Sequence, residues 1–343
     1  MSITVFLIFK LALIAVILGL SLVIAMYSTL VERKFAGFIQ DRYGPDRAGK
    51  WGILQPVCDG VKLFFIEEYM PNTADKFLYI LGPSLTMLVA LLTSAVIPWG
   101  GTLSLGTNQF SLQVAGSSID ILYIFAVVSM GVYGVMIGGW ASNNKYALLG
   151  AVRASSQMIS YELAMGLSIA SVIMMSGTLS LQDIVHQQQA SMWNVVYQPL
   201  GFLIFFICAL AETNRAPFDL PECEAELIGG YHTEYSAMKL GFYLFAEYIN
   251  MFVSSAIIST LFFGGYHVPF IQNLGLPGNL VTILGTVFLF VKIFLFILLF
   301  MWVRWTLPRF RYDQLMKLGW KILLPLALVN LIVTGIVTLI LQK

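Results

Sequence analysis

Residues 279–303, NLVTILGTVFLFVKIFLFILLFMWV, contain one charged side chain, Lys292, in an otherwise apolar run. A helix needs roughly 20 such residues to cross a bilayer whose apolar core is about 30 Å thick. The run also lacks the alternation of a barrel strand, and backbone groups in lipid must be bonded within their own segment. The stretch therefore predicts a transmembrane helix.

Further apolar runs of this kind occur along the whole chain, near residues 3–30, 77–98, 119–140, 157–177, 193–211, 237–263 and 322–341. Hydrophobic residues make up 58% of the chain and charged residues 11%, and the mean hydropathy is +0.83. These values lie far outside the range of soluble domains. We therefore expect an all-α, polytopic membrane protein with eight transmembrane helices, built as a single domain over residues 1–343. The first run is too long for a signal peptide and lacks a small-residue cleavage site, so we expect it to persist as a helix.

Basic residues fall on one side of this arrangement. Sixteen of the 19 Lys and Arg residues lie in or next to four loops, at about residues 31–76, 141–156, 212–236 and 304–321. No Lys or Arg occurs in the three opposite segments, near residues 99–118, 178–192 and 264–278. Short basic loops are retained in the cytoplasm. We therefore expect the four basic loops to be cytoplasmic and both termini to be periplasmic.

Sequence motifs for metal, phosphate or nucleophile chemistry are missing. Cys58, Cys208 and Cys223 have no metal-ligand spacing, and three is an odd number for a disulfide framework. The three histidines are equally scattered, and the sequence has neither a glycine-rich phosphate loop nor a Ser, His, Asp arrangement. We expect the chain to bind no metal or redox cofactor of its own.

Some positions inside the predicted helices need an explanation. Gly134 and Gly138 have the spacing that lets helix backbones approach closely, which favours packing over function. Lys10 is near enough to a helix end for its ammonium to reach the interface, and Asp120 fits a helix-end residue. Lys292 is too deep for this, because a mid-bilayer charge costs roughly 2.5–3.5 kcal/mol or more without a partner. It is either part of a buried ion pair or a residue of a proton path.

Residues 211–236, AETNRAPFDLPECEAELIGGYHTEYS, concentrate acid between two predicted helices. The carboxylates in this segment are Glu212, Asp219, Glu222, Glu224, Glu226 and Glu234. Pro221 and the acids that follow read as the first turns of a short helix. Crowded carboxylates repel one another and take up or release protons as a set. The segment is therefore either a proton-holding cluster or a solvated acidic loop that pairs with Arg215, Lys239 or a partner's basic patch.

Two further acids, Glu162 and Glu247, lie a few residues inside the ends of their predicted helices, in the runs SYELAMG and LFAEYIN. Both helix ends are on the same side as the acidic segment. The i to i+4 spacing puts Arg153 and Gln157 on one helix face, and Tyr243 and Glu247 on another. The two acids either extend the acidic segment into the membrane or are solvated by lipid headgroups.

The acidic segment resembles the signature of the quinone-site membrane subunits of NADH:quinone oxidoreductase, respiratory complex I, which are called the H subunit in bacteria and subunit one in mitochondria. Three other blocks agree with that family: residues 31–62 (VERKFAGFIQDRYGP through GILQPVCDGVK), 144–162 (NKYALLGAVRASSQMISYE) and 304–325 (RWTLPRFRYDQLMKLGWKILLP). The resemblance covers about residues 30–330.

The resemblance implies a cofactor-free subunit that anchors the peripheral arm and forms the membrane part of the quinone chamber. NADH, FMN and iron–sulfur clusters would be bound by partner subunits, and quinone would pass between the first and sixth helices and a short amphipathic helix at 51–67. The residues that match charges of the quinone chamber are Glu32, Arg33, Arg304, Arg309 and Arg311. The acids that match proton-coupling positions are Asp59, Glu67, Glu162, Asp219, Glu222, Glu224, Glu226, Glu234 and Glu247. Glu212 and Arg215 would brace the loop.

The sequence departs from the family pattern at a few positions. Ile66 stands where many relatives have Lys, which puts an ion pair at that helix end in doubt. Cys58 and Cys223 replace Ala or Gly, and Asp46 replaces a frequent Asn.

We expect quinone reduction to change the charge near Glu222, Glu224 and Glu226, and the buried acids to relay that change to proton translocation. Partners would be the quinone-module subunits of the peripheral arm and neighbouring small membrane-arm subunits, in a bacterial inner membrane rather than a mitochondrial one. Two alternatives stay open at this point. One is a purely structural docking scaffold, and the other is the related anchor subunit of an energy-converting hydrogenase.

Overall fold

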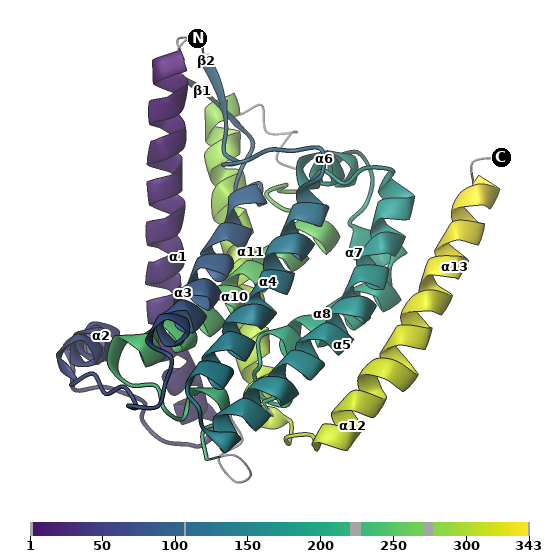
Figure 1. Ribbon diagram of the computed structural model, residues 1–343. Helices are drawn as coiled ribbons and strands as arrows, with labels where there is room; N and C mark the ends of the chain where they lie inside the picture. Colours follow the sequence, from purple (N-terminus) through teal and green to yellow (C-terminus); the bar gives the residue numbers. More distant parts are fainter. Residues whose placement is uncertain (1–2, 106–107, 220–227, 270–276, 342–343) are drawn as a thin grey trace.

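The computed structural model describes residues 3–105, 108–219, 228–269 and 277–341. Long helices dominate it (Figure 1). The helices are α1 Ile3–Ile39, α2 Gln55–Phe65, α3 Lys76–Thr93, α4 Asp120–Ala141, α5 Lys145–Ser176, α6 Leu181–Ala190, α7 Asn194–Tyr197, α8 Pro199–Glu212, α10 Ala237–Phe262, α11 Gly278–Thr306, α12 Tyr312–Lys317 and α13 Leu324–Leu341. Short 3-10 turns lie at Lys50–Gly52, Ser94–Val96 and Gly230–His232, and Leu318–Leu323 is π-helical.

Seven helical segments of the described chain are long and apolar enough to cross a membrane. They confirm a mostly helical, polytopic membrane protein. The eighth expected span, near 193–211, is divided into α7 and α8. The break lies at Gln198, whose φ of −130° and ψ of 57° are not helical. Pro199 follows it, and the residue before a proline is kept out of the α region by steric clash. With 14 residues, α8 alone is about 21 Å long, shorter than the apolar core of a bilayer.

Several elements differ in extent from the sequence expectation. The first helix continues through Ile39, because residues 31–36 contain no helix-breaking residue. α5 begins at Lys145, where the Asn144 side chain caps it by accepting the Tyr146 N–H at 2.9 Å. The amphipathic helix expected at 51–67 is present as α2. The β1–β2 hairpin, Thr102–Leu105 paired antiparallel with Asn108–Ser111, is an addition to the all-α expectation.

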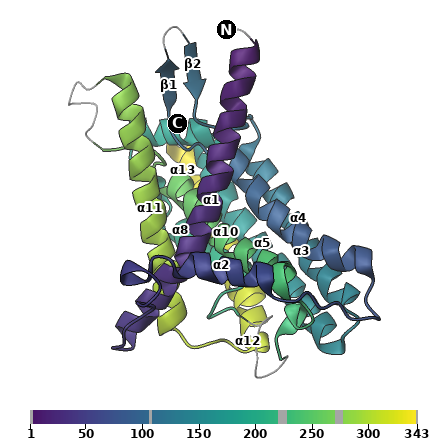
Figure 2. The same ribbon diagram turned by 90° about the vertical axis from the view of Figure 1, so that its left-hand side faces the viewer.

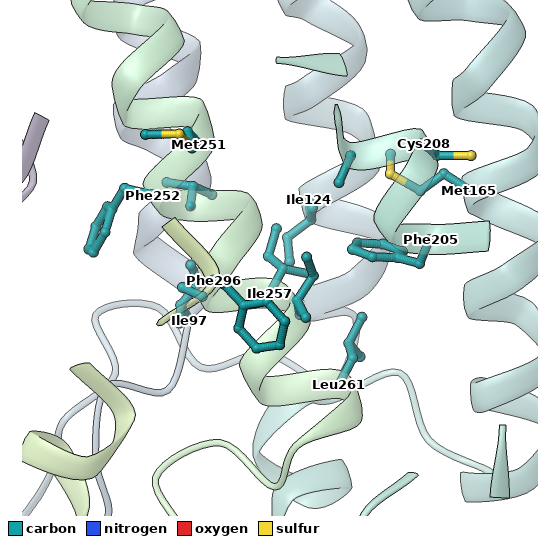
Figure 3. Close-up of a cluster of buried hydrophobic side chains, with 14 of the residues drawn as sticks. Ile97, Ile124, Met165, Phe205, Cys208, Met251, Phe252, Ile257, Leu261 and Phe296 are labelled. Carbon is teal, nitrogen blue, oxygen red and sulfur yellow. The ribbon is translucent and has the colours of Figure 1, made fainter. Parts of the chain in front are cut away.

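The long helices stand side by side, with α2 lying across them near the C-terminal end of α1 (Figure 2). The start of α1 and the end of α13 lie at one end of the bundle, and α12 lies at the other (Figure 1). α10 is central, since 72% of its most apolar stretch is buried, against 11% for α1. Around α10 the core is a cluster of aliphatic, aromatic and sulfur side chains, including Phe205, Cys208, Met251 and Phe296 (Figure 3).

Small residues bring α3 and α4 into direct contact. A Cβ atom added at Gly82 would lie 2.8 Å from the Cα of Gly138, and one at Gly134 would lie 2.5 Å from Cγ2 of Thr86. These distances are shorter than real Cβ contacts, so the two backbones touch. The Gly134–Gly138 spacing therefore serves helix packing.

Asp120 and Lys292, two charged residues of the expected helices, form hydrogen bonds with backbone groups of neighbouring segments. Asp120 begins α4 and accepts hydrogen bonds from Ser117 N at 2.9 Å and from Leu181 N at 3.2 Å. Lys292 donates to the carbonyl oxygens of Phe263 at 2.6 Å and Gly265 at 2.8 Å. It thereby holds the turn that follows α10. Lys292 forms no ion pair with any described residue. Carbonyl oxygens therefore take the place of the carboxylate that a buried ion pair would have required.

Candidate functional site

Glu32 is the centre of a buried charged cluster. It lies on α1, and its side chain is 6% exposed. Its two carboxylate oxygens accept hydrogen bonds from Arg215, at 2.5 Å, and from Arg304. The hydroxyl of Tyr248 donates to Glu32 Oε2 at 2.9 Å. A buried carboxylate needs such partners, because leaving a charge unpaired away from water is costly.

The Glu32 cluster joins four segments of the chain. Arg304 comes from the last turn of α11, Tyr248 from α10, and Arg215 from the loop after α8. The guanidinium of Arg215 also lies 3.9 Å from the centroid of the Tyr248 ring, in cation–π contact. Burial opposes its charged form, but the nearby Glu32 and Tyr248 raise the pKa of Arg215 above its ordinary value. With two guanidiniums around one carboxylate, the cluster keeps an excess positive charge that can attract an electron-rich oxygen.

A second ion pair attaches α2 to α1. Arg33 lies 2.7 Å from Asp59 Oδ2, and the amide of Gln55 donates to Asp59 Oδ1 at 2.9 Å. Glu67, beyond the end of α2, is exposed. Arg33, expected at the quinone chamber, therefore pairs with Asp59, expected in the proton path. Glu67, the other acid expected there near α2, lies at the surface.

A third contact holds the loop before the acidic cluster. Arg309 NH2 lies 2.6 Å from Asp219 Oδ2, and Phe310 N donates to Pro217 O at 3.1 Å. Arg311 is apart from this contact and faces the exposed Asp313 at 3.7 Å. An exposed pair of that length contributes little. Glu222, Glu224 and Glu226 lie outside the described residues.

The remaining carboxylates lie within or beside the bundle. Glu162 of α5 accepts a hydrogen bond from Ser129 of α4, so it faces a neighbouring helix. Glu247 of α10 accepts one from the Tyr231 hydroxyl at 3.2 Å. Glu234 accepts one from the amide of Asn144 at 2.5 Å.

Glu212 occupies a position that the sequence reasoning assigned only to loop bracing. It lines a cavity of about 40 Å³ together with Glu247, Tyr231 and Asn250. It also lines a second cavity of about 20 Å³, which Asn250 shares. Polar cavities of this size have room for water. Glu212 also interacts electrostatically with Glu162, so it is linked to Glu247 by the first cavity and to Glu162 by charge.

Sequence signals for these additional residues were weak. Glu212 could have been found, because it ends an apolar run directly before the acidic segment. Tyr248 and Ser129 carry no such signal, since their roles depend on residues that are 216 and 33 positions away in the chain.

Within the described residues, no group of His, Cys, Asp or Glu side chains is arranged to hold a metal ion.

Comparison with known proteins gives consistent matches over nearly the whole chain. The NADH dehydrogenase family matches residues 11–335. An H subunit of the NADH-quinone oxidoreductase of Cytophaga hutchinsonii is 65% identical over 330 residues, which is 96% of each chain. The H subunit of the same enzyme from Flavobacterium psychrophilum is 60% identical over 98% of each chain. That of Leptospira biflexa is 50% identical over 91% of this chain and 90% of its own. With this identity and coverage, the chain belongs to the NADH dehydrogenase family of membrane subunits, whose bacterial relatives are named as the H subunit of NADH-quinone oxidoreductase.

Proposed function

We propose that this chain is the membrane-arm subunit of a proton-pumping NADH:quinone oxidoreductase, in which it forms the membrane part of the quinone chamber and links quinone reduction to proton translocation. The family and the names of its relatives favour this function over a hydrogenase anchor. NADH, FMN and iron–sulfur clusters belong to partner subunits in this proposal, and quinone is the substrate.

One observation carries the coupling part of the proposal: charged groups continue from the Glu32 cluster into the bundle. The charge of Arg215 interacts with both Glu32 and Glu247. Glu247 shares a cavity with Glu212, and Glu212 interacts with Glu162. Charge interactions therefore join Arg215 to Glu32 and Glu247, and Glu212 to Glu162, while a shared cavity joins Glu247 to Glu212.

Such a series can transmit a change of charge. If a reduced quinone next to the Glu32 cluster draws a proton or shifts Arg215, the electrostatic stabilisation of the Glu247 carboxylate changes. Coupled carboxylates then redistribute their protons as a set. Water in the first cavity would carry protons between Glu247 and Glu212, and the charge of Glu212 would act on Glu162. The acids Glu222, Glu224 and Glu226 would respond first, because they belong to the loop that also carries Arg215.

The orientation and partners follow from the same proposal. The basic loops would face the cytoplasm of a bacterium, with both chain ends in the periplasm, and α7 and α8 would together make the eighth crossing of the inner membrane. Arg309, which is exposed on the loop surface, would meet the quinone-module subunits of the peripheral arm. Small membrane-arm subunits would cover part of the apolar face.

The first experiment replaces Glu162 and Glu247, one at a time, by Gln in the assembled complex. Removal of a proton-transfer group costs roughly 10²–10⁴-fold in rate when that transfer limits turnover. We expect at least a tenfold loss of NADH:quinone reductase activity and of proton pumping in membrane vesicles. Asp46→Asn is the matched control, because Asp46 is an exposed acid of a basic loop and lines neither of the cavities at Glu212. Turnover and pumping at wild-type levels in both Gln variants would exclude the relay.

A structural scaffold makes a different prediction. If the acids only dock partner subunits, Gln variants would lower the amount of complex on native gels and leave the turnover per assembled complex unchanged. Measuring assembly and turnover in the same membranes therefore separates docking from proton coupling.

A further inference from the structure

Two adjoining hollows along the first half of α1 are not used by the function proposed above. One, the outer recess, has a volume of about 690 Å³, and both Lys10 and Asp183 line it. The other, the α1–α3 groove, has a volume of about 520 Å³, and Ile14 and Leu88 belong to its two walls. Val114 lines both hollows, so they adjoin each other.

The two hollows follow one face of α1. Phe6 and Lys10 line the outer recess, and Ile14 and Leu18 line the α1–α3 groove. Residues spaced by four lie on the same side of a helix. At a rise of 1.5 Å per residue, the stripe from position 6 to 18 is about 18 Å long. Half of a 30 Å apolar core is about 15 Å, so the stripe has the length of one membrane leaflet.

The α1–α3 groove offers only hydrocarbon contacts. Its two serines, Ser84 and Ser94, donate their hydroxyl protons to the carbonyls of Ile80 and Leu91, at 2.8 and 2.6 Å. The other lining side chains are apolar. Leu88 is 52% exposed and therefore faces whatever fills the groove. The groove suits an alkyl chain rather than a polar ligand.

The outer recess has one charge of each sign. The ammonium of Lys10 donates to the Gln113 carbonyl oxygen and has three protons, so two remain for a ligand. Asp183 is an exposed acid in the first turn of α6. Neither side chain forms an ion pair with any residue that the structure describes. The hydroxyls of Ser117 and Ser118 line the same recess.

We propose that the outer recess and the α1–α3 groove bind one phospholipid with a zwitterionic headgroup, of the phosphatidylethanolamine type. Its phosphate lies at Lys10, its ammonium at Asp183, and one acyl chain follows Ile14, Leu18 and Leu88. Charge-assisted hydrogen bonds of both signs select this headgroup. An anionic headgroup without an ammonium leaves Asp183 unpaired, and an uncharged quinone matches neither side chain.

The first test counts lipids on the purified complex. Native mass spectrometry after detergent washing should find phosphatidylethanolamine on the wild-type complex. Lys10→Gln and Leu88→Trp should each retain one such molecule fewer. Leu11→Trp is the matched control and should retain the wild-type number, because Leu11 is 65% exposed on α1 and lines neither hollow. Wild-type lipid counts in both Lys10→Gln and Leu88→Trp would overturn the site.

The second test asks which headgroup and which occupant are bound. In exchange with an equal mixture of phosphatidylethanolamine and phosphatidylglycerol, the wild-type complex should prefer the former severalfold, and Asp183→Asn should lose that preference. An unchanged preference would refute the ammonium contact.

A photo-crosslinking residue in place of Leu88 should label phospholipid. Labelling of another protein of the complex or of quinone would mean that a different occupant fills the groove.

Discussion

The carboxylate of Glu32 connects parts of the chain that are far apart in sequence. Its partners Arg215, Tyr248 and Arg304 are 183, 216 and 272 positions away. The sequence block around Glu32 indicates the quinone chamber by resemblance alone. The three partners could not be derived from spacing, because they meet only when α1, α10 and α11 pack together.

At this site we predict an order of stabilities for three variants. Glu32→Gln leaves two guanidiniums without their anion, and breaking a buried pair costs about 3–5 kcal/mol. Tyr248→Phe removes one hydrogen bond to a charged group, worth about 1.5–3 kcal/mol. Arg311→Gln is the surface control and should cost at most about 1 kcal/mol. Thermal unfolding of the purified complex measures the order, with Glu32→Gln lowest. Equal unfolding temperatures for Glu32→Gln and Arg311→Gln would contradict a stabilising role of the cluster.

At the scale of elements, the sequence predicted the close α3–α4 contact better than the division between α7 and α8. The spacing of Gly134 and Gly138 predicted close packing of a helix, and α3 is the helix that fills this surface. The division between α7 and α8 was harder to predict. Apolar composition continues across residues 193–211, but Pro199 fixes the backbone before it in a non-helical form. A hydropathy pattern does not detect that local steric effect.

The α3–α4 contact gives a prediction with an internal control. In Gly82→Ala the new Cβ would lie 2.8 Å from the Gly138 backbone, so the helices must separate. Overpacking of this kind costs about 1–3 kcal/mol. In Gly131→Ala the nearest side-chain atom, Val89 Cγ1, is at an ordinary 3.5 Å, and Ala favours a helix. Thermal unfolding should show a lower midpoint for Gly82→Ala and an unchanged or higher one for Gly131→Ala. The reverse order would show that α3 and α4 do not pack this closely in the membrane.

At the scale of the molecule, the two ends of the bundle that the basic residues distinguish in the sequence are also distinct in the structure. The helix α2 and the loops with most of the basic residues lie at one end, whereas the start of α1 and the end of α13 lie at the other (Figures 1 and 2). Termini on one side require an even number of crossings. With the seven long helices, the proposed eighth crossing by α7 and α8 would satisfy this condition.

The proposed orientation can be measured with a membrane-impermeant maleimide. Thr4→Cys, exposed near the start of α1, should be labelled in cells whose outer membrane is permeabilised. Cys58 on α2 is exposed and should be labelled only after the inner membrane is opened. Cys58→Ser identifies the second signal by removing it. Labelling of Cys58 before the inner membrane is opened would invert the orientation.

Most of the fold was predictable, and the candidate site was predictable only in part. Apolar runs located the seven long helices, because a bilayer demands long uninterrupted apolar segments. The hairpin β1–β2 and the helix α6 were not predicted, since they lie outside the membrane-spanning runs. The start of α6 depends on the bond from Leu181 N to Asp120, and the hairpin is bonded through Ser104 to Asn279 at the start of α11. The roles of Glu222, Glu224 and Glu226 stay predictions, because these residues lie outside the described parts of the chain.

The sequence by itself determined the membrane class, the positions of the long helices and the family, because composition and motif are properties of neighbouring residues. The roles of the acids that match family positions stay predictions. Only the tertiary structure decided which charges meet. It paired Glu32 with Arg215 and Arg304, bonded Lys292 to carbonyl oxygens of the turn after α10, and placed Glu212 in a cavity with Glu247 and in electrostatic interaction with Glu162. The physical reason is that electrostatic partners are selected by distance in the folded bundle, and these distances depend on how each helix is rotated against its neighbours.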